Sequence, residues 1–225
     1  MSKEKASTLS SIHSEATGSS GALPVKLSLP KGFSFDEKEH KYFLGDVEIP
    51  GFTYLLKESE LIDDRFYTEF SRSRGKSIHL AVQLDNEGDL DESTLDPKIV
   101  PYLKAWREFK NAEQVIPIPE LMEKPIASSI HRFGTTPDVP AYFGKDKIPV
   151  IIELKSSAIM PWWGRLQTAC QQIALKEVAG MSFPVRIGLR LGSDGRCQRK
   201  DYINPRDRED FLSLVRAHWL KKEKK

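Results

Sequence analysis

The strongest constraint on the fold comes from residues 149–157, which read PVIIELKSS. Val150, Ile151 and Ile152 are β-branched, and a run of such residues is typical of a buried strand. The same run then carries Glu153 and Lys155, although a charge is costly to bury unless a partner compensates it. The segment therefore predicts a buried strand that ends in charged residues, which core packing alone does not explain.

Strand-like and helix-like spacing alternate along the rest of the chain. Residues 23–56 hold aromatic residues between Gly and Pro and predict a small β element with a turn at 44–46. Helical spacing follows at 64–88, with an interruption around Arg74 and Gly75, and again at 96–114. The first part of the chain is therefore predicted to contain a hairpin followed by two helices.

The second part starts with strand-like segments. Residues 121–157 predict three strands, 164–180 a helix ending at Gly180, 184–203 a hairpin, and 204–222 an amphipathic helix. The resulting order β, α, α, β, β, β, α, β, β, α predicts a single α/β or α+β domain around a mixed sheet.

The predicted domain occupies residues 25–220. Residues 1–24 are rich in Ser, Thr, Gly and Lys and have almost no bulky apolar side chain, so we expect a disordered tail there. Residues 221–225 are predicted to form a short basic C-terminal tail.

The charge balance does not identify a partner. The chain has 34 Lys and Arg against 32 Asp and Glu, a net charge of +2. Residues 186–225 are mainly basic, whereas residues 84–96 carry acidic residues and no basic one. Either run is also explained by an ordinary solvated surface.

Cys170 and Cys197 are the chain's two cysteines. Two thiols cannot build an iron–sulfur cluster or a disulfide framework, so we expect neither, and we expect a reducing, cytoplasmic compartment. The sequence has no apolar run of the roughly 18–20 residues that a membrane helix needs, so no membrane association is predicted.

A second carboxylate gives the charged strand a chemical meaning. Asp138 lies fifteen residues before Glu153, at the end of a preceding predicted strand, so a strand–turn–strand connection can bring both to one end of the sheet. Two carboxylates and a backbone carbonyl are hard oxygen ligands that suit Mg²⁺ or Mn²⁺. Lys155 beside them could orient or deprotonate a water for phosphodiester hydrolysis. A plain ion pair on an edge strand would give the same Glu-x-Lys pattern.

The pattern Pro137-Asp138, then Glu153-Leu154-Lys155, resembles the PD-(D/E)XK nuclease superfamily. The RecB-like branch often adds Gly-x-x-x-His on an earlier helix and Gln-x-x-x-Tyr on a later one, and this chain has Gly75, His79 and Gln167 in that order. The likeness to phage and prophage exonuclease-like proteins covers roughly residues 33–219. It implies a restriction-endonuclease-like fold, with a mixed central β-sheet flanked by α-helices.

The resemblance also implies a role for each site residue. Asp138, Glu153 and the Leu154 carbonyl would bind Mg²⁺ or Mn²⁺, His79 would add a ligand, and Lys155 would position or activate water. Glu123 would act in the outer shell or on a second metal, with Glu120 as a competitor for that role. Gln167 would steady the site or contact the DNA backbone.

Two departures from the family pattern affect the substrate contacts. Gln171 stands where relatives often have Tyr, so another residue would supply that contact, and Trp162 and Trp163 could stack on bases. Arg74 and Arg165 are further candidate DNA-binding residues. Pro140, soon after Asp138, is expected to end its strand early.

The resemblance implies a metal-dependent deoxyribonuclease, an exonuclease more than an endonuclease, that acts in DNA recombination, repair or replication. Its partners would be DNA ends, recombination or replication proteins and, in a homo-oligomer, further copies of the chain, in a bacterial or phage-infected cell. The alternatives are a non-catalytic DNA-binding or protein-interaction module on the same fold and a structure-selective endonuclease.

Overall fold

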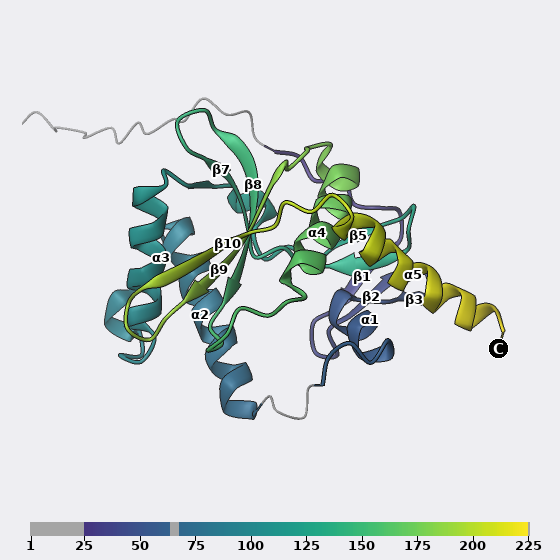
Figure 1. Cartoon of the computed structure of the whole chain (residues 1–225), viewed down its shortest axis with the longest axis horizontal. Coiled ribbons are helices and arrows are strands. Elements are labelled where there is room, and N and C mark those ends of the chain that lie inside the picture. The colour runs from purple at the N-terminus through teal and green to yellow at the C-terminus, as the bar shows by residue number, and fades with distance from the viewer. Residues whose placement is uncertain (1–24, 64–67, 225) are drawn as a thin grey trace, which may run out of the picture.

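A computed structural model describes residues 25–63 and 68–224 of the chain. Its centre is a five-stranded mixed sheet of order β10-β9-β8-β7-β4 (Figure 1). β8 and β9 run parallel, and the other neighbours pair antiparallel. The strands are β4 (Ile116–Pro117), β7 (Val139–Phe143), β8 (Ile148–Lys155), β9 (Val185–Leu191) and β10 (Cys197–Asp201). The predicted mixed central sheet is confirmed.

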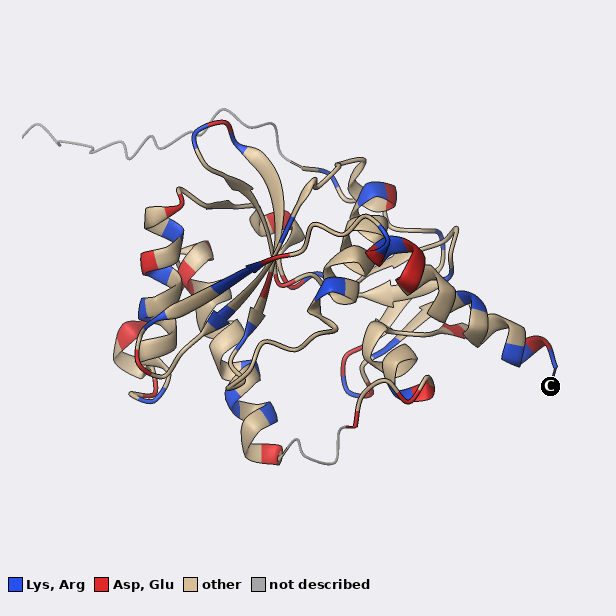
Figure 2. Cartoon of the chain, viewed as in Figure 1, with Lys and Arg blue, Asp and Glu red and all other residues tan. Residues whose placement is uncertain are grey.

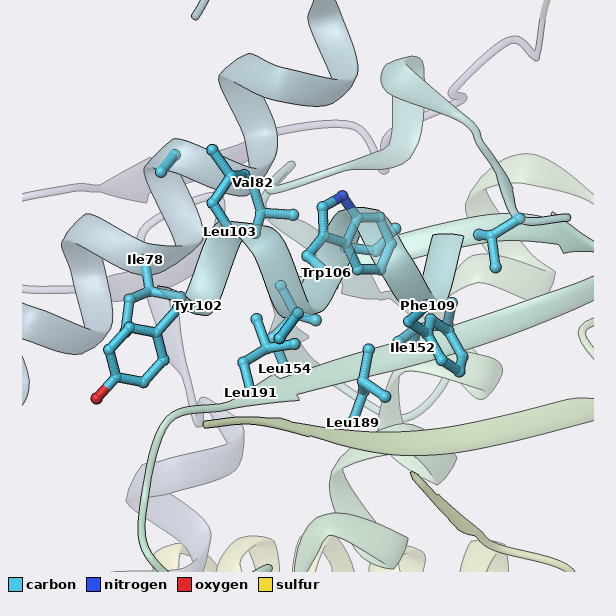
Figure 3. Close-up of a cluster of buried hydrophobic side chains, with 14 of the residues drawn as sticks. Ile78, Val82, Tyr102, Leu103, Trp106, Phe109, Ile152, Leu154, Leu189 and Leu191 are labelled. Atoms are coloured by element: carbon cyan, nitrogen blue, oxygen red, sulfur yellow. The ribbon is translucent and has the colours of Figure 1, made fainter. Parts of the chain in front are cut away.

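Helices cover both faces of this sheet. α2 (Glu69–Glu87) and α3 (Val100–Ala112) pack on one face, and α4 (Gly164–Ala179) and α5 (Asp207–Glu223) lie on the other (Figure 1). Ile152 and Leu154 of β8 face the first pair of helices, where Trp106 is fully buried (Figure 3). Ile151 faces the second pair. β8 is therefore buried on both sides, as its apolar run predicts.

A smaller β region packs beside α4 and α5. It consists of β1 (Phe33–Asp36), β2 (Lys41–Leu44) and β3 (Val47–Ile49), followed by α1 (Phe52–Glu58) and the hairpin of β5 (Ile126–Ser128) and β6 (Phe133–Thr135). The ring of Tyr42 lies against Gly134, where an added Cβ would sit 2.1 Å from Tyr42 Cγ. Two 3₁₀ turns complete the described elements, η1 (Glu92–Thr94) and η2 (Pro119–Leu121).

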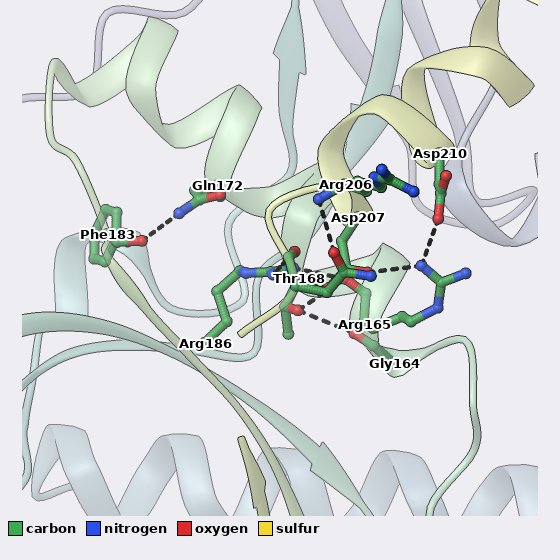
Figure 4. A network of polar contacts seen from close by, with 10 residues as sticks. Gly164, Arg165, Thr168, Gln172, Phe183, Arg186, Arg206, Asp207 and Asp210 are labelled. Carbon is green, nitrogen blue, oxygen red and sulfur yellow. Dashed lines mark hydrogen bonds and ion pairs between the residues drawn. The ribbon is translucent and has the colours of Figure 1, made fainter. Parts of the chain in front are cut away.

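α5 is fixed to the body by a buried ion-pair network. Asp207, at the start of α5, accepts hydrogen bonds from Arg165 of α4 (2.6 Å) and from Arg186 of β9 (2.8 Å) (Figure 4). Arg165 also reaches Asp210 at 2.6 Å. Since Arg186 and Asp207 are both buried, this contact joins the sheet, α4 and α5 away from solvent.

Several predicted elements are confirmed with shifted limits. The turn at 44–46 joins β2 to β3, and Gly180 ends α4 with a left-handed φ of 65°. α2 runs without a break through Arg74 and Gly75, so the predicted interruption is wrong. Residues 121–157 form four strands rather than three, and α1 was not predicted.

The predicted tails have different outcomes. Residues 1–24 and Lys225 lie outside the described residues. Residues 221–223, which we placed in a basic tail, form the last turn of α5 instead. Lys221 and Lys222 lie at the carboxyl end of that helix, where the helix dipole favours positive charge.

Residues of both charge signs lie on α3 and on α5 (Figure 2). Asp85, in the acidic run, lies 2.6 Å from Arg107 and 3.1 Å from Lys110 of α3, and Glu92 lies 2.7 Å from Arg107. α3 therefore pairs with two of the six acidic residues of that run. Within the described chain, no helix combines the length and apolar character needed to cross a membrane.

Candidate metal centre

Asp138 and Glu153 meet at one end of the central sheet. β7 and β8 are antiparallel with Val139 opposite Ile152, so Asp138, one residue before β7, lies level with Glu153. Asp138 therefore precedes a strand, and the predicted placement at a strand's end is wrong. The side chains of Asp138 and Glu153 still converge, because β7 starts at the end of the sheet where β8 finishes. Both side chains are buried.

Pro140 lies within β7, so our expectation that it ends the strand early is also wrong. Its carbonyl accepts a hydrogen bond from Ile118 N at 2.9 Å. In a strand, the backbone N and the carbonyl of one residue point to the same side. The position where Pro140 lacks an N–H therefore faces Ile118, and no hydrogen bond to β8 is lost.

Asp138 is held by the backbone of the neighbouring strand. Its Oδ2 accepts a hydrogen bond of 2.7 Å from Leu154 N. The Leu154 carbonyl lies on the same side of β8 as that N–H, and so on the Asp138 side, as its predicted role requires. Asp138 Oδ1 remains directed toward His79, whose Nδ1 lies 3.6 Å away.

His79 and Glu123 complete a compact ligand set with Asp138. His79 Nδ1 lies 3.1 Å from Glu123 Oε1, and one ligand atom from each of the three residues lies within 4.8 Å of the others. Glu123 has a left-handed φ of 48°, and its N–H donates to Pro137 O at 2.9 Å, which fixes it beside Asp138. Carboxylate oxygens and an imidazole nitrogen suit a divalent cation.

The two glutamates lie in different surroundings. Glu123 is part of the ligand set, whereas Glu120 is exposed on η2. The ligand set as defined by the 4.8 Å distance does not include Glu153.

Glu153 instead accepts hydrogen bonds from a residue of its own strand and from a residue of α4. Lys155 Nζ donates to Glu153 Oε1 at 2.5 Å, and Gln171 Nε2 donates to Glu153 Oε2 at 2.7 Å. Lys155 also donates to Gln167 Oε1 at 3.1 Å. Glu153 and Lys155 are two residues apart on a strand and so point to the same face, and Gln167 and Gln171 are four apart on a helix and also share a face. Gln171 therefore faces Glu153, and Gln167 faces Lys155. Sequence reasoning missed the Gln171 contact, because Gln171 was read only as a departure from Tyr.

The electrostatics of the cluster show a shortage of positive charge. Burial, together with the charge of Asp138, raises the pKa of Glu153 to about 7, although Lys155 and Gln171 act against this. Burial also raises the pKa of Asp138. For His79 burial lowers the pKa, but the carboxylates of Asp138 and Glu123 outweigh it and raise the value to about 9. A bound cation would compensate these carboxylates, so the donor set fits a divalent metal.

Of the clefts that open onto the cluster, two are lined by Lys155 as well as by His79. The larger one, about 570 Å³, holds Asp138, Glu153 and Glu123 and extends to Tyr42 and His40. The smaller one, about 300 Å³, lies between α1, α2 and the loop before α4, and its lining combines apolar residues, Trp163 among them, with polar and basic ones; we call it the Trp163 cleft. His79 and Lys155 line both clefts.

The predicted DNA-binding residues separate into two groups. Trp163 lines the smaller cleft and Gln167 the larger. Trp162, 46% exposed, is absent from the lining of both clefts, and so are Arg74 and Arg165. Arg165 is engaged by Asp207 and Asp210, and Arg74 lies over the ring of Phe70 at 5.8 Å. Arg165 is therefore held in ion pairs, and its role as a DNA contact stays a prediction.

Comparison with solved structures gives distant likenesses. No protein-family model and no curated protein matches the chain. A solved structure from Eubacterium rectale named "Putative exonuclease" has a TM-score of 0.44 and 10% identity, over 76% of this chain and 71% of that one. The solved protein SSO0001 has a TM-score of 0.33 and 12% identity, over 73% of this chain and 82% of that one. Likenesses at these scores do not identify a function.

Proposed function

We propose that the chain is a metal-dependent deoxyribonuclease of the PD-(D/E)XK superfamily, in its RecB-like, phage exonuclease-like branch. One observation carries the proposal. Buried Asp138 and Glu153 lie level on adjacent strands, with His79 and Glu123 converging on Asp138 and Lys155 bonded to Glu153. Burying this many carboxylates together is costly without a cation.

The proposal gives each acid a role. His79, Glu123 and Asp138 would hold Mg²⁺ or Mn²⁺, with Glu153 and the Leu154 carbonyl next to them. A divalent cation bound there would supply positive charge to the phosphate and the leaving oxygen. Leu154 N–H keeps Asp138 oriented, and Glu123 is fixed by its bond to Pro137.

In this proposal Lys155 acts on the reacting groups. Its ammonium is oriented by Glu153 and Gln167 and lies 4.7 Å from the centre of the Trp163 ring. Because Lys155 lines both clefts, it can donate to a phosphate oxygen or hold the attacking water there. Gln171 keeps the Glu153 carboxylate in the position where Lys155 meets it.

The finer assignment rests on the family resemblance. It favours an exonuclease over an endonuclease, in recombination, repair or replication in a bacterial or phage-infected cell. DNA ends, recombination or replication proteins and further copies of this chain are the corresponding partners.

The test follows labelled linear single-stranded, linear double-stranded and covalently closed circular DNA in Mg²⁺, Mn²⁺ or EDTA. Wild type is compared with Asp138→Asn, Glu153→Gln and Lys155→Ala, and with Glu120→Gln as a control on an exposed acid of the same chain. We expect linear DNA to be lost only with metal, the three site variants to be inactive and Glu120→Gln to be active.

The circular substrate separates the two kinds of nuclease. Circles that survive while linear DNA is degraded support an exonuclease, and circles that are cut support an endonuclease. If the wild type binds DNA but cuts none of the substrates with either metal, the nuclease proposal is wrong and a binding module takes its place.

A further inference from the structure

Phe52 and Trp163 form an aromatic wall of the Trp163 cleft, and Phe211 of the core packs against Phe52. Phe52 lies 6.0 Å from Trp163 between ring centres and 6.1 Å from Phe211 of the core. Leu56, Ile62 and Pro161 add further apolar surface to the lining. A wall anchored in this way does not have to be ordered when a flat ring binds against it, which reduces the entropic cost of binding.

The position of this cleft restricts what can occupy it. His79 and Lys155 form part of its lining and also of the larger cleft that contains the carboxylates. The two clefts also share Phe52, Thr53 and Lys57 of α1, so a ligand that spans both passes between α1 and His79 of the ligand set. A molecule suited to this path has a flat apolar ring on one side and a phosphate at the junction, which describes a nucleotide within a strand.

Size and shape favour an unpaired nucleotide. A cleft of about 300 Å³ lies at the lower end of the range for ligand pockets. A base inside a duplex is stacked on two faces and paired along its edge, so it reaches a walled cleft only after leaving the stack. An unpaired base at the end of a strand has no such cost.

We propose that the Trp163 cleft binds the unpaired base beside the scissile phosphate, so that the chain acts on single-stranded or frayed DNA ends. This inference rests on the nuclease function proposed above and specifies its substrate. Lys155 links the two sites, because its ammonium contacts both Glu153 and the Trp163 ring.

Binding is tested without catalysis by short single-stranded oligonucleotides that carry 2-aminopurine at the terminal position, in EDTA. We expect wild type to quench the terminal probe by stacking and Trp163→Ala to lose the quenching. Trp163→Phe keeps an aromatic face and should restore it. Trp162→Ala is the matched control, since its neighbouring indole is absent from the cleft lining.

Kinetics with Mg²⁺ provide the second readout. Trp163→Ala should raise KM for a single-stranded end about 5- to 150-fold, the range typical of losing one base–aromatic stack. We expect Trp163→Phe to recover most of the loss and Trp162→Ala to match wild type. Blunt duplexes should be degraded more slowly than duplexes with unpaired ends.

The two proposals fail in different ways. A wild type that cleaves DNA with the same KM as Trp163→Ala, or that does not quench the probe, overturns the base-binding cleft and leaves the nuclease function intact. A wild type that quenches the probe but cuts no DNA with either metal overturns the nuclease function, while the cleft still binds a base.

Discussion

Gln171 holds one oxygen of the Glu153 carboxylate in the candidate site. Its Nε2 donates to Glu153 Oε2 at 2.7 Å, from the position where the RecB-like family that the sequence resembles often has Tyr. Its Oε1 has no hydrogen-bond partner among the described residues. The contact leaves Lys155 as the partner of the other carboxylate oxygen, so each oxygen of Glu153 is assigned to one donor.

Gln171→Leu tests this positioning role. We expect metal affinity or activity to fall about 10- to 100-fold, the usual cost of losing an outer contact to a metal site. The measurement is the Mn²⁺ concentration needed for half-maximal cleavage. An unchanged metal requirement and rate would show that Lys155 alone orients Glu153.

The two glutamates near the site make a second matched pair. Glu123 lies 3.1 Å from His79, whereas Glu120 is exposed three residues earlier. Glu123→Gln should weaken Mn²⁺ binding, measured by calorimetry, by more than the 10- to 100-fold typical of an outer contact. Glu120→Gln should bind Mn²⁺ as wild type does, and equal affinities for the two variants would exclude Glu123 from the ligand set.

Much of the site was predictable because the chemistry has a fixed spacing. Asp138, Glu153, Lys155 and His79 were all selected from the sequence, and the structure brings them together. The choice between Glu120 and Glu123 was not predictable, since it depends on the left-handed backbone at Glu123 and on its bond to Pro137. Both are tertiary features that leave no periodic signal in the sequence.

At the scale of elements, long periodic segments were predicted well and short ones poorly. α3 and α4 have clear apolar spacing, and Gly180 marks the end of α4. α1 spans seven residues inside a region rich in aromatic residues, so its Phe52, Leu55 and Leu56 were read as part of a β element. Helix α2 continues through Gly75 because its buried face, with Ile78 and Val82, packs on the core.

The attachment of α5 depends on Asp207 more than on Asp210. Removing Asp207 leaves Arg186 buried without its carboxylate partner, so Asp207→Ala should lower the free energy of unfolding by about 3–5 kcal/mol. Asp210 is 47% exposed, and Asp210→Ala should cost less than about 1 kcal/mol. Urea unfolding of both variants checks the prediction, and similar losses would contradict it.

Two glycines should respond to alanine with opposite signs. At Gly134 an added Cβ would lie 2.1 Å from Tyr42 Cγ, so Gly134→Ala should destabilise the small β region by about 1–3 kcal/mol through overpacking. At Gly75 the nearest atom is Ser156 Oγ at 3.8 Å, and Gly75→Ala should stabilise α2 by about 1 kcal/mol. Thermal unfolding measures both, and a stabilised Gly134→Ala would show that Tyr42 can move away.

At the scale of the whole molecule, two apolar clusters flank one sheet, and the polar site lies where that sheet ends. The cluster with Trp106 supports β8 from one face, and the cluster with Phe211 supports it from the other. This support fixes the carboxylates in a buried position that they would not adopt on stability grounds alone. Burial of these carboxylates without a cation therefore lowers the stability of the folded chain.

Metal binding should raise the free energy of unfolding of the whole chain. A ligand at 100 times its Kd stabilises the native state by about 2.7 kcal/mol, which for a chain of this size raises Tm by about 5–11 °C. We expect this rise in wild type with Mn²⁺ and its reversal by EDTA.

Asp138→Asn removes one buried charge beside Glu153 and Glu123 while leaving an oxygen to accept from Leu154 N. In EDTA this variant should therefore be at least as stable as wild type, and it should show no rise in Tm with Mn²⁺. Glu120→Gln should behave as wild type in both conditions. A wild type whose Tm ignores Mn²⁺, or an Asp138→Asn variant that still responds to it, would show that the ligand set does not bind the cation.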